Sequence, residues 1–185
     1  MMIRRRANPR LRRLVLIAGM LAAIATAESA KADDWPKPAQ WANRYAFEGP
    51  DHADFYKLAS IRAALQKLIG DQFYREVILA WRTSFPILVD GDSMVVEACM
   101  SHYCDSHQVT TIIQGRRVDV CTYRTYWQET DATNTTTGER VWFLEGAGVP
   151  VVERLDPGDA TGCLFDDMAD AMRKVKHARE LSVNP

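Results

Sequence analysis

Residues Met94–Gln114 read MVVEACMSHYCDSHQVTTIIQ, and this stretch decides the fold. Apolar and β-branched residues fill both ends, which is typical of two strands, Met94–Cys99 and His107–Gln114. The polar segment between them is expected to be the turn that joins the strands. This turn is unusual, because it holds two cysteines five residues apart, Cys99 and Cys104, with His102 between them.

The flanking segments extend this pair of strands into an antiparallel meander. Upstream, Ile87-Leu88-Val89 runs into Asp90-Gly91, a two-residue hairpin signal that leads back to Met94. Downstream, apolar and polar residues alternate with the two-residue period of a strand. The downstream sequence predicts a turn at Gly115-Arg116, a strand over 118–127, a polar loop over 130–138, a strand over 140–144 and a turn over 156–159.

Helical periodicity appears on both sides of the meander. Apolar residues recur at helical spacing over 52–69, with Asp51 as the expected N-cap and Gly70 as the stop. Residues 72–82 fit a helix or a strand, and 166–181 fit a C-terminal helix. The sequence therefore predicts an α+β domain: an antiparallel β-sheet of about five strands flanked by an N-terminal and a C-terminal helix.

The N-terminus has the three parts of an export signal. Six arginines precede an apolar run from Leu14 to Ala27, and Ala30-Lys31-Ala32 follows as an A-x-A cleavage pattern. The run is short for a membrane span, although an uncleaved anchor is the alternative. We expect a cleavable signal peptide over residues 1–32, a single domain over 33–185 in the periplasm, and no membrane contact after cleavage.

Removal of the leader changes the charge of the chain. The leader carries seven basic residues and one acidic residue, which leaves 16 basic and 23 acidic residues in 33–185, a net charge of −7. An acidic domain repels phosphate, so no nucleic-acid partner is expected. The charge would attract a cationic partner, or would serve solubility alone.

All four cysteines, Cys99, Cys104, Cys121 and Cys163, lie in the exported part. An oxidising compartment and an even count favour two disulfides, although four cysteines allow three pairings. A Cys99–Cys104 bond would close a very tight, protruding loop and leave Cys121 to pair with Cys163. Free buried thiols are the alternative.

The Cys99–Cys104 segment is the candidate site. A small disulfide ring fixes the backbone before a partner arrives, and His102 would project near its tip. Zinc binding by Cys99, His102, Cys104 and His107 is disfavoured by the spacing, as is a redox site, and a stapled turn with a bystander histidine stays open. The chain carries no G-x-S-x-G, H-E-x-x-H, P-loop or dinucleotide motif, so no enzyme activity, cofactor or metal is expected.

The segment Val96–Val109 resembles the signature loop of the Ivy family, periplasmic inhibitors of vertebrate lysozyme. That family has a strand ending in Ala-Cys, a Cys-Lys-Pro-His-Asp-Cys loop and a Gly-Ser-Gln start to the next strand; this chain has Ala98-Cys99, Met100–Tyr103 within the ring, and Ser106-His107-Gln108. The resemblance implies an antiparallel sheet flanked by helices, with the stapled loop protruding. It also implies that the histidine at position 102 plugs the active site of lysozyme.

The loop departs from the family where Met100-Ser101 replaces Lys-Pro and Tyr103 replaces Asp. The resemblance implies an inhibitor of C-type lysozyme, a cationic target. The inhibitory loop would comprise Met100, Ser101, His102, Tyr103 and Asp105. The alternative is a periplasmic structural or interaction protein of the same fold, and a homodimer stays open. An exposed His102 would favour the inhibitor, whereas burial under Trp127 or Trp142 would favour the structural protein.

Overall fold

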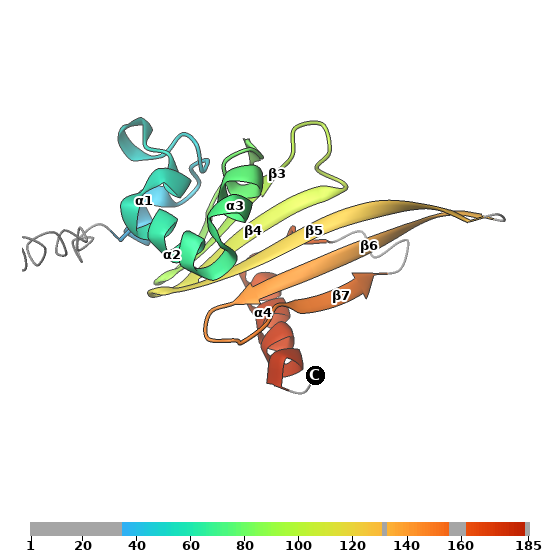
Figure 1. Ribbon diagram of the computed structural model, residues 1–185. Coiled ribbons are helices and arrows are strands. Elements are labelled where there is room, and N and C mark those ends of the chain that lie inside the picture. The colour runs from blue at the N-terminus through green and yellow to red at the C-terminus, as the bar shows by residue number, and fades with distance from the viewer. Residues whose placement is uncertain (1–34, 131–132, 156–161, 184–185) are drawn as a thin grey trace, which may run out of the picture. The chain divides into compact units, whose positions relative to one another are not determined.

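A twisted antiparallel sheet forms the centre of the structure (Figure 1). The computed structural model describes residues 35–130, 133–155 and 162–183, which all belong to one compact unit. Within these residues seven strands form one sheet in the order β1-β3-β4-β5-β6-β7, with β2 also paired to β3. The strands are β1 (Thr83–Ser84), β2 (Leu88–Asp90), β3 (Ser93–Cys99), β4 (His107–Gln114), β5 (Arg117–Thr130), β6 (Thr133–Leu144) and β7 (Val151–Leu155).

Helices cover both faces of the sheet. α2 and α3 lie over one face, whereas α4 lies against the other (Figure 1). No helix among the described residues is long and apolar enough to cross a membrane. The helices are α1 (Pro38–Trp41), α2 (Ala59–Ile69), α3 (Asp71–Phe73) with a π-helical turn at Tyr74–Ile78, and α4 (Met168–Val183); 3-10 turns span Pro50–His52 and Phe55–Lys57.

The sheet is buried on both faces because its central strands carry apolar side chains on both faces. In β3, Met94 and Val96 enter the core beneath α2, while Val95 between them enters the core beneath α4. In β4, Ile113 and Ile112 divide between the two cores in the same way. Alternate side chains of a strand point to opposite faces, so a continuous apolar run requires cover on both sides.

These features confirm the α+β prediction and refine its details. β4 covers the predicted residues, α4 begins and ends within two residues of the expected bounds, and 72–82 begins as helix. The predicted hairpin turn is shifted by one residue, because Asp90 pairs with Ser93 and the turn residues are Gly91 and Asp92. Gly91 has φ of 57°, a conformation that glycine adopts without steric cost.

The prediction of a helix over 52–69 with Asp51 as N-cap was wrong at its start. The helix begins at Ala59, and Asp51 has φ of 53° within a 3-10 turn. The carboxylate of Asp54 accepts a hydrogen bond of 3.1 Å from the backbone N–H of Tyr56. Such a local turn satisfies the backbone without a helix, which is why aspartate competes with helix formation here.

The predicted loop over 130–138 was also wrong. β5 and β6 continue as a paired ladder outwards to Thr130 and Thr133 (Figure 1). The segment has no apolar alternation, yet it is rich in threonine, a β-branched residue that favours strands. Edge strands β1 and β7 were not predicted. The signal peptide over 1–32 and the turn over 156–159 lie outside the described residues.

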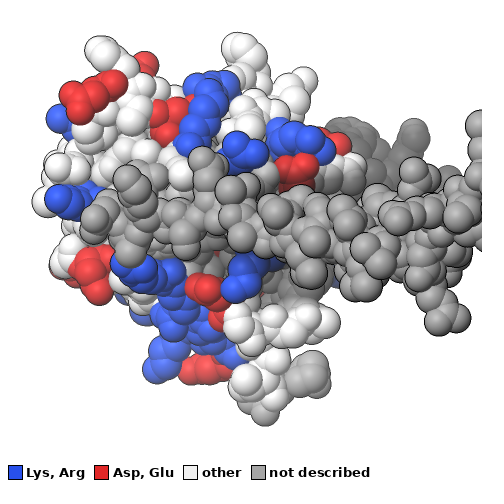
Figure 2. Space-filling view, turned by 60° about the vertical axis from the view of Figure 1, so that its left-hand side comes forward, with Lys and Arg blue, Asp and Glu red and all other residues white. Residues whose placement is uncertain are grey.

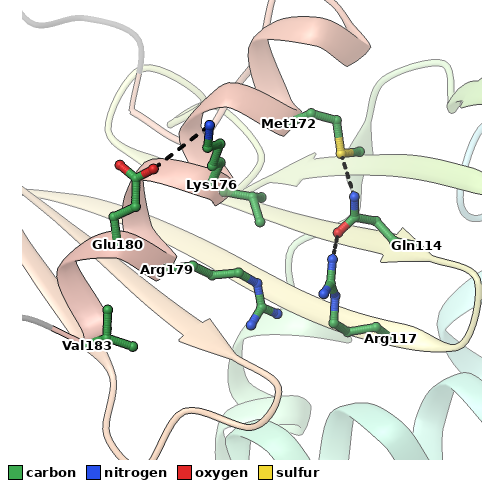
Figure 3. A pocket seen from close by; sticks show the side chains of 8 residues that line it. Gln114, Arg117, Met172, Lys176, Arg179, Glu180 and Val183 are labelled. Atoms are coloured by element: carbon green, nitrogen blue, oxygen red, sulfur yellow. Dashed lines mark hydrogen bonds and ion pairs between the residues drawn. The ribbon is translucent and has the colours of Figure 1, made fainter.

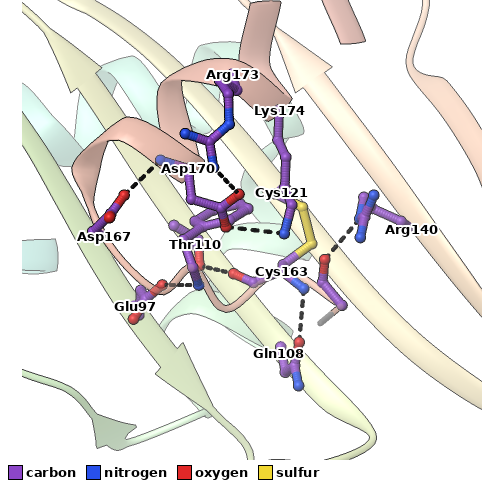
Figure 4. A network of polar contacts seen from close by, with 12 residues as sticks. Glu97, Gln108, Thr110, Cys121, Arg140, Cys163, Asp167, Asp170, Arg173 and Lys174 are labelled. Atoms are coloured by element: carbon purple, nitrogen blue, oxygen red, sulfur yellow. Dashed lines mark hydrogen bonds and ion pairs between the residues drawn. A yellow bond between two sulfur atoms is a disulfide. The ribbon is translucent and has the colours of Figure 1, made fainter. Parts of the chain in front are cut away.

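A short segment before α4 is fixed to the sheet by a disulfide and by polar contacts (Figure 4). Cys121 of β5 is bonded to Cys163, with their Cα atoms 5.7 Å apart, which confirms the predicted second pairing. Arg140 Nε donates to the carbonyl of Gly162 at 2.7 Å, and the Thr110 hydroxyl donates to the carbonyl of Cys163. The segment is thereby held against the face of the sheet that α4 covers.

Glu97 is the buried acid of this network. One of its carboxylate oxygens accepts from the backbone N–H of Phe165 at 2.7 Å (Figure 4). Burial raises the pKa of Glu97 to about 7, and the charges of Asp166 and Asp170 act in the same direction. Its folded-state pKa therefore exceeds the ordinary carboxyl value, so the folded state binds a proton more readily than the unfolded chain.

We predict that Glu97 makes the protein more stable at pH 5 than at pH 8. The contribution is fully present below the unfolded pKa near 4.5 and is lost as the pH rises through about 7. Glu97→Gln keeps the acceptor for Phe165, and it should remove this dependence, which we expect to be on the order of 1 to 3 kcal/mol. Urea unfolding at pH 5 and pH 8 measures the difference in the free energy of unfolding. Glu48→Gln, the same change at an exposed position, is the control. Equal pH dependence in wild type and Glu97→Gln would contradict the prediction.

Candidate functional site

The candidate site is the turn between β3 and β4, which stands away from the end of the sheet (Figure 1). Cys99 and Cys104 form the predicted disulfide across it, with their Cα atoms 4.9 Å apart. Met100 N–H donates to the His107 carbonyl at 3.1 Å and so extends the ladder one step past the last register pair, Cys99 with Gln108. Because both sulfur atoms are bonded to each other, the zinc set considered from the sequence cannot form.

His102 lies at the apex of the loop. The Tyr103 N–H donates to the Met100 carbonyl at 2.9 Å and closes a tight turn whose corners are Ser101 and His102. His102 has φ of 68°, a left-handed conformation that is rare outside glycine and costs on the order of 1 kcal/mol. The side chain of His102 is exposed, and it lies neither under Trp142, which is buried in the α4-side core, nor in any other part of the described core.

Two further contacts tie the loop to neighbouring strands. The hydroxyls of Ser101 and Thr83 share a hydrogen bond of 3.1 Å, which joins the loop to β1. On the other side, Thr125 N–H of β5 donates to the Ser106 carbonyl at 3.0 Å. The loop is thus supported from both flanks, and its apex projects between them.

A stack of rings supports the loop from the α3 side of the sheet. Tyr103 contacts His107 edge-on with ring centroids 6.0 Å apart, and His107 contacts Trp81 in the same manner at 5.7 Å. The guanidinium of Arg124 lies 5.5 Å from the ring centroid of Trp81. Burial lowers the pKa of His107, and the charge of Arg124 acts in the same direction. His107 therefore packs between Trp81 and Tyr103, in surroundings that favour its neutral form.

The opposite side of the loop is attached through Gln108. Its Nε2 donates to the carbonyl of Cys104 at 2.8 Å, while its Oε1 accepts from the N–H of Cys163 at 2.7 Å. Gln108 is only 2% exposed. The same carboxamide thus connects the first disulfide loop to the segment held by the second disulfide. Figure 4 shows its bond to Cys163.

The predicted site residues form one exposed surface. Ser101, His102 and Asp105 are exposed, and Met100 and Tyr103 are 39% and 52% exposed although both are large and partly apolar. Tyr126 of β5, which follows Thr125 along the chain, is 48% exposed. The hydrogen bond between Ser106 and Thr125 places the start of the hairpin beside the loop.

The sequence did not identify every residue that builds the site. Gln108 entered only as a residue of the family pattern, and Thr83, Thr125 and Tyr126 were not singled out. The alternation of β5 places Tyr126 on the same face as Arg124, so its position follows from strand periodicity once the length of β5 is known. The contacts of Thr83 depend on β1, a strand of two residues that carries no periodic signal.

A separate groove of about 400 Å³ lies between α4 and the turn from β4 to β5 (Figure 3). It is lined by Gln114, Arg117, Met172, Val175, Lys176, Arg179, Glu180 and Val183. Gln114 ends β4, whereas the loop precedes its first residue, so the two sites are roughly 20 Å apart along the strand. All three of its cations are paired, Lys176 with Glu180 and both arginines with Asp119. The groove is therefore not part of the loop site.

The comparison with protein families identifies the matched segment. Residues 60–142 match the family model described as inhibitor of vertebrate lysozyme (Ivy). No curated protein and no solved structure matches the chain at a significant level. The matched residues begin in α2, include the whole stapled loop, and end in β6. The segment that carries the candidate site is therefore the segment that matches the family model of inhibitor of vertebrate lysozyme (Ivy).

Proposed function

We propose that this protein inhibits a C-type lysozyme in the periplasm by inserting the Cys99–Cys104 loop into the active site. The observation that carries the proposal is the exposed His102 at the apex of a loop closed by a disulfide. The family match supports lysozyme inhibition in general. The target class, the plug mechanism and the compartment are parts of the proposal.

The chemistry of the target fits an imidazole. A lysozyme cleaves glycan between two carboxyl groups, one protonated and one ionised, that lie about 5–5.5 Å apart in retaining enzymes. The two nitrogens of an imidazole point to different sides of the ring, and each can form a hydrogen bond of about 2.8 Å. His102 can therefore accept from the protonated acid and donate to the ionised one, taking the place of the substrate.

The rigidity of the loop supports tight binding. Ordering a flexible loop on association costs about 0.5–1.5 kcal/mol for each immobilised side chain. Here the disulfide, the turn closed by Tyr103 and Met100, and the bond between Ser101 and Thr83 restrain the loop before a partner arrives. Exposed Tyr103 and Tyr126 supply aromatic surface beside the apex, and tyrosine is enriched among residues that dominate binding energy.

Electrostatics would contribute through the net charge. Residues 33–185 carry a net charge of −7, and the proposed target is cationic. Acidic and basic side chains are interspersed on the face shown in Figure 2, so attraction on that face does not depend on one acidic patch. Long-range attraction of this kind raises the association rate more than it slows dissociation.

The second candidate function is a periplasmic interaction protein of the same fold that does not inhibit lysozyme. Met100, Ser101 and Tyr103, which replace the Lys-Pro and Asp of the family, are the observation that favours it. Titration of the protein into a cell-wall lysis assay with a C-type lysozyme separates the two candidates. Dose-dependent inhibition supports the inhibitor, whereas full lysis at micromolar excess supports the alternative.

We predict that His102→Ala leaves the unfolding transition unchanged and raises the inhibition constant by about 30-fold or more. The residue is exposed, so little packing is lost, whereas truncation at the desolvated centre of an interface costs about 2 kcal/mol or more. His102→Asn, which tolerates the left-handed backbone, should lose inhibition to a similar extent. His177→Ala, an exposed histidine of α4, is the matched control. If His102→Ala inhibits lysozyme as strongly as the wild type, His102 does not plug the active site.

We also predict that association with lysozyme slows as the ionic strength rises to 0.15 M, where the screening length is about 8 Å. Asp105→Asn, a change within the site, should reduce the association rate at low salt by about twofold. Asp51→Asn makes an equal change of charge at an exposed position of the turn Pro50–His52, outside the loop, and it should have little effect. Stopped-flow measurement tests both variants. If the association rate is the same at all salt concentrations and in both variants, the net charge serves solubility alone.

A further inference from the structure

We propose that Gln108 is a positioning residue that transmits the rigidity of the Cys121–Cys163 disulfide to the Cys99–Cys104 loop. The inference extends the proposed function, because a better-ordered loop binds a target more tightly. It concerns this chain in particular, since the second disulfide lies outside the loop pattern that the family resemblance rests on.

The path between the two disulfides is short and continuous. Cys121 holds Cys163 covalently, the N–H of Cys163 donates to Oε1 of Gln108, and Nε2 of Gln108 donates to the carbonyl of Cys104. These hydrogen bonds measure 2.7 and 2.8 Å. One buried carboxamide therefore bonds to a backbone atom of a cysteine from each disulfide.

Gly162 and Cys163, the anchor segment, are held to the sheet by hydrogen bonds that do not involve the loop. The Thr110 hydroxyl donates to the Cys163 carbonyl, and Arg140 Nε donates to the Gly162 carbonyl at 2.7 Å. Gly162 leaves no room for a side chain, because a Cβ there would lie 2.6 Å from Cδ1 of Tyr123. The anchor segment thus packs directly against Gln108 and Tyr123, and both Gln108 and Cys163 are buried.

The loop end of the path needs this support. The disulfide fixes the distance between Cys99 and Cys104 but leaves the ring free to pivot about the end of β3. The ring stack through Tyr103 and His107 restrains it on the α3 side of the sheet. Gln108 acts on the opposite side, where its bond to Cys104 opposes that pivot. Loss of either support would leave the orientation of the loop to the other support and to the bonds of Ser101 with Thr83 and of Ser106 with Thr125.

Gln108→Met tests the proposal in the full exported chain, because it removes both hydrogen bonds and keeps the side-chain volume. The matched control is Gln114→Met, the same change six residues along the same strand, where the carboxamide bonds to Met172 and Arg117. The double variant Cys121→Ser/Cys163→Ser removes the second disulfide while Gln108 remains. Hydrogen exchange of the amides of Tyr103, Ser106 and His107, whose N–H groups bond within the loop, reports loop order without any target.

We expect Gln108→Met and the double cysteine variant to raise exchange of these amides about fivefold, as loss of one net hydrogen bond implies, while Gln114→Met leaves it unchanged. Amides in the centre of β4 serve as the internal reference for global unfolding. The dissociation rate from lysozyme should rise by a similar factor in the same two variants. Equal loop exchange in Gln108→Met and wild type, or an equal rise in Gln114→Met, would overturn the proposal. Wild type that fails to bind lysozyme would overturn the proposed function alone, since the exchange measurement does not need the target.

Discussion

The antiparallel pairing of β3 with β4 is the constraint on which the rest of the structure depends. Its register runs from Ser93 opposite Gln114 to Cys99 opposite Gln108, and both strands are almost wholly buried. A slip of one residue would exchange the side chains of the two cores, so the fit of each side chain to its own core fixes the register. That register places the two ends of the loop side by side, where the cysteines can bond and where Gln108 reaches the carbonyl of Cys104.

Because the sheet is buried on both faces, each of its two cores supports a different side of the loop. The core beneath α2 holds Trp81, on which His107 and then Tyr103 of the loop rest. The core beneath α4 holds Cys163, which is joined to the other side of the loop through Gln108. The loop is exposed, yet both of its supports end in buried residues, so the candidate site is attached to both cores of the domain.

The sequence predicted those features that have a strong local signal. Apolar runs on either side of a cysteine-containing turn predicted β3, β4 and the loop, and helical spacing predicted α4. The early start of the first helix was wrong because Asp54 forms a local turn that periodicity does not reveal. The outer part of the β5–β6 hairpin was read as a loop because its strand character comes from threonine and not from alternation. The ring stack and the Gln108 path could not be predicted, since each joins residues from several strands whose register must be known first.

If the loop occupies the active site of a C-type lysozyme, as we propose, it must exclude other ligands of that site. Competition with a chitin trisaccharide, a ligand of that active site, tests this without altering either protein. Binding of this protein to lysozyme is measured by calorimetry at increasing trisaccharide concentration. Occlusion of the active site predicts that the apparent dissociation constant rises in proportion to trisaccharide above its own dissociation constant, as expected when two ligands exclude each other. A dissociation constant that stays the same at saturating trisaccharide would show that both bind together, and would rule out occlusion by the loop.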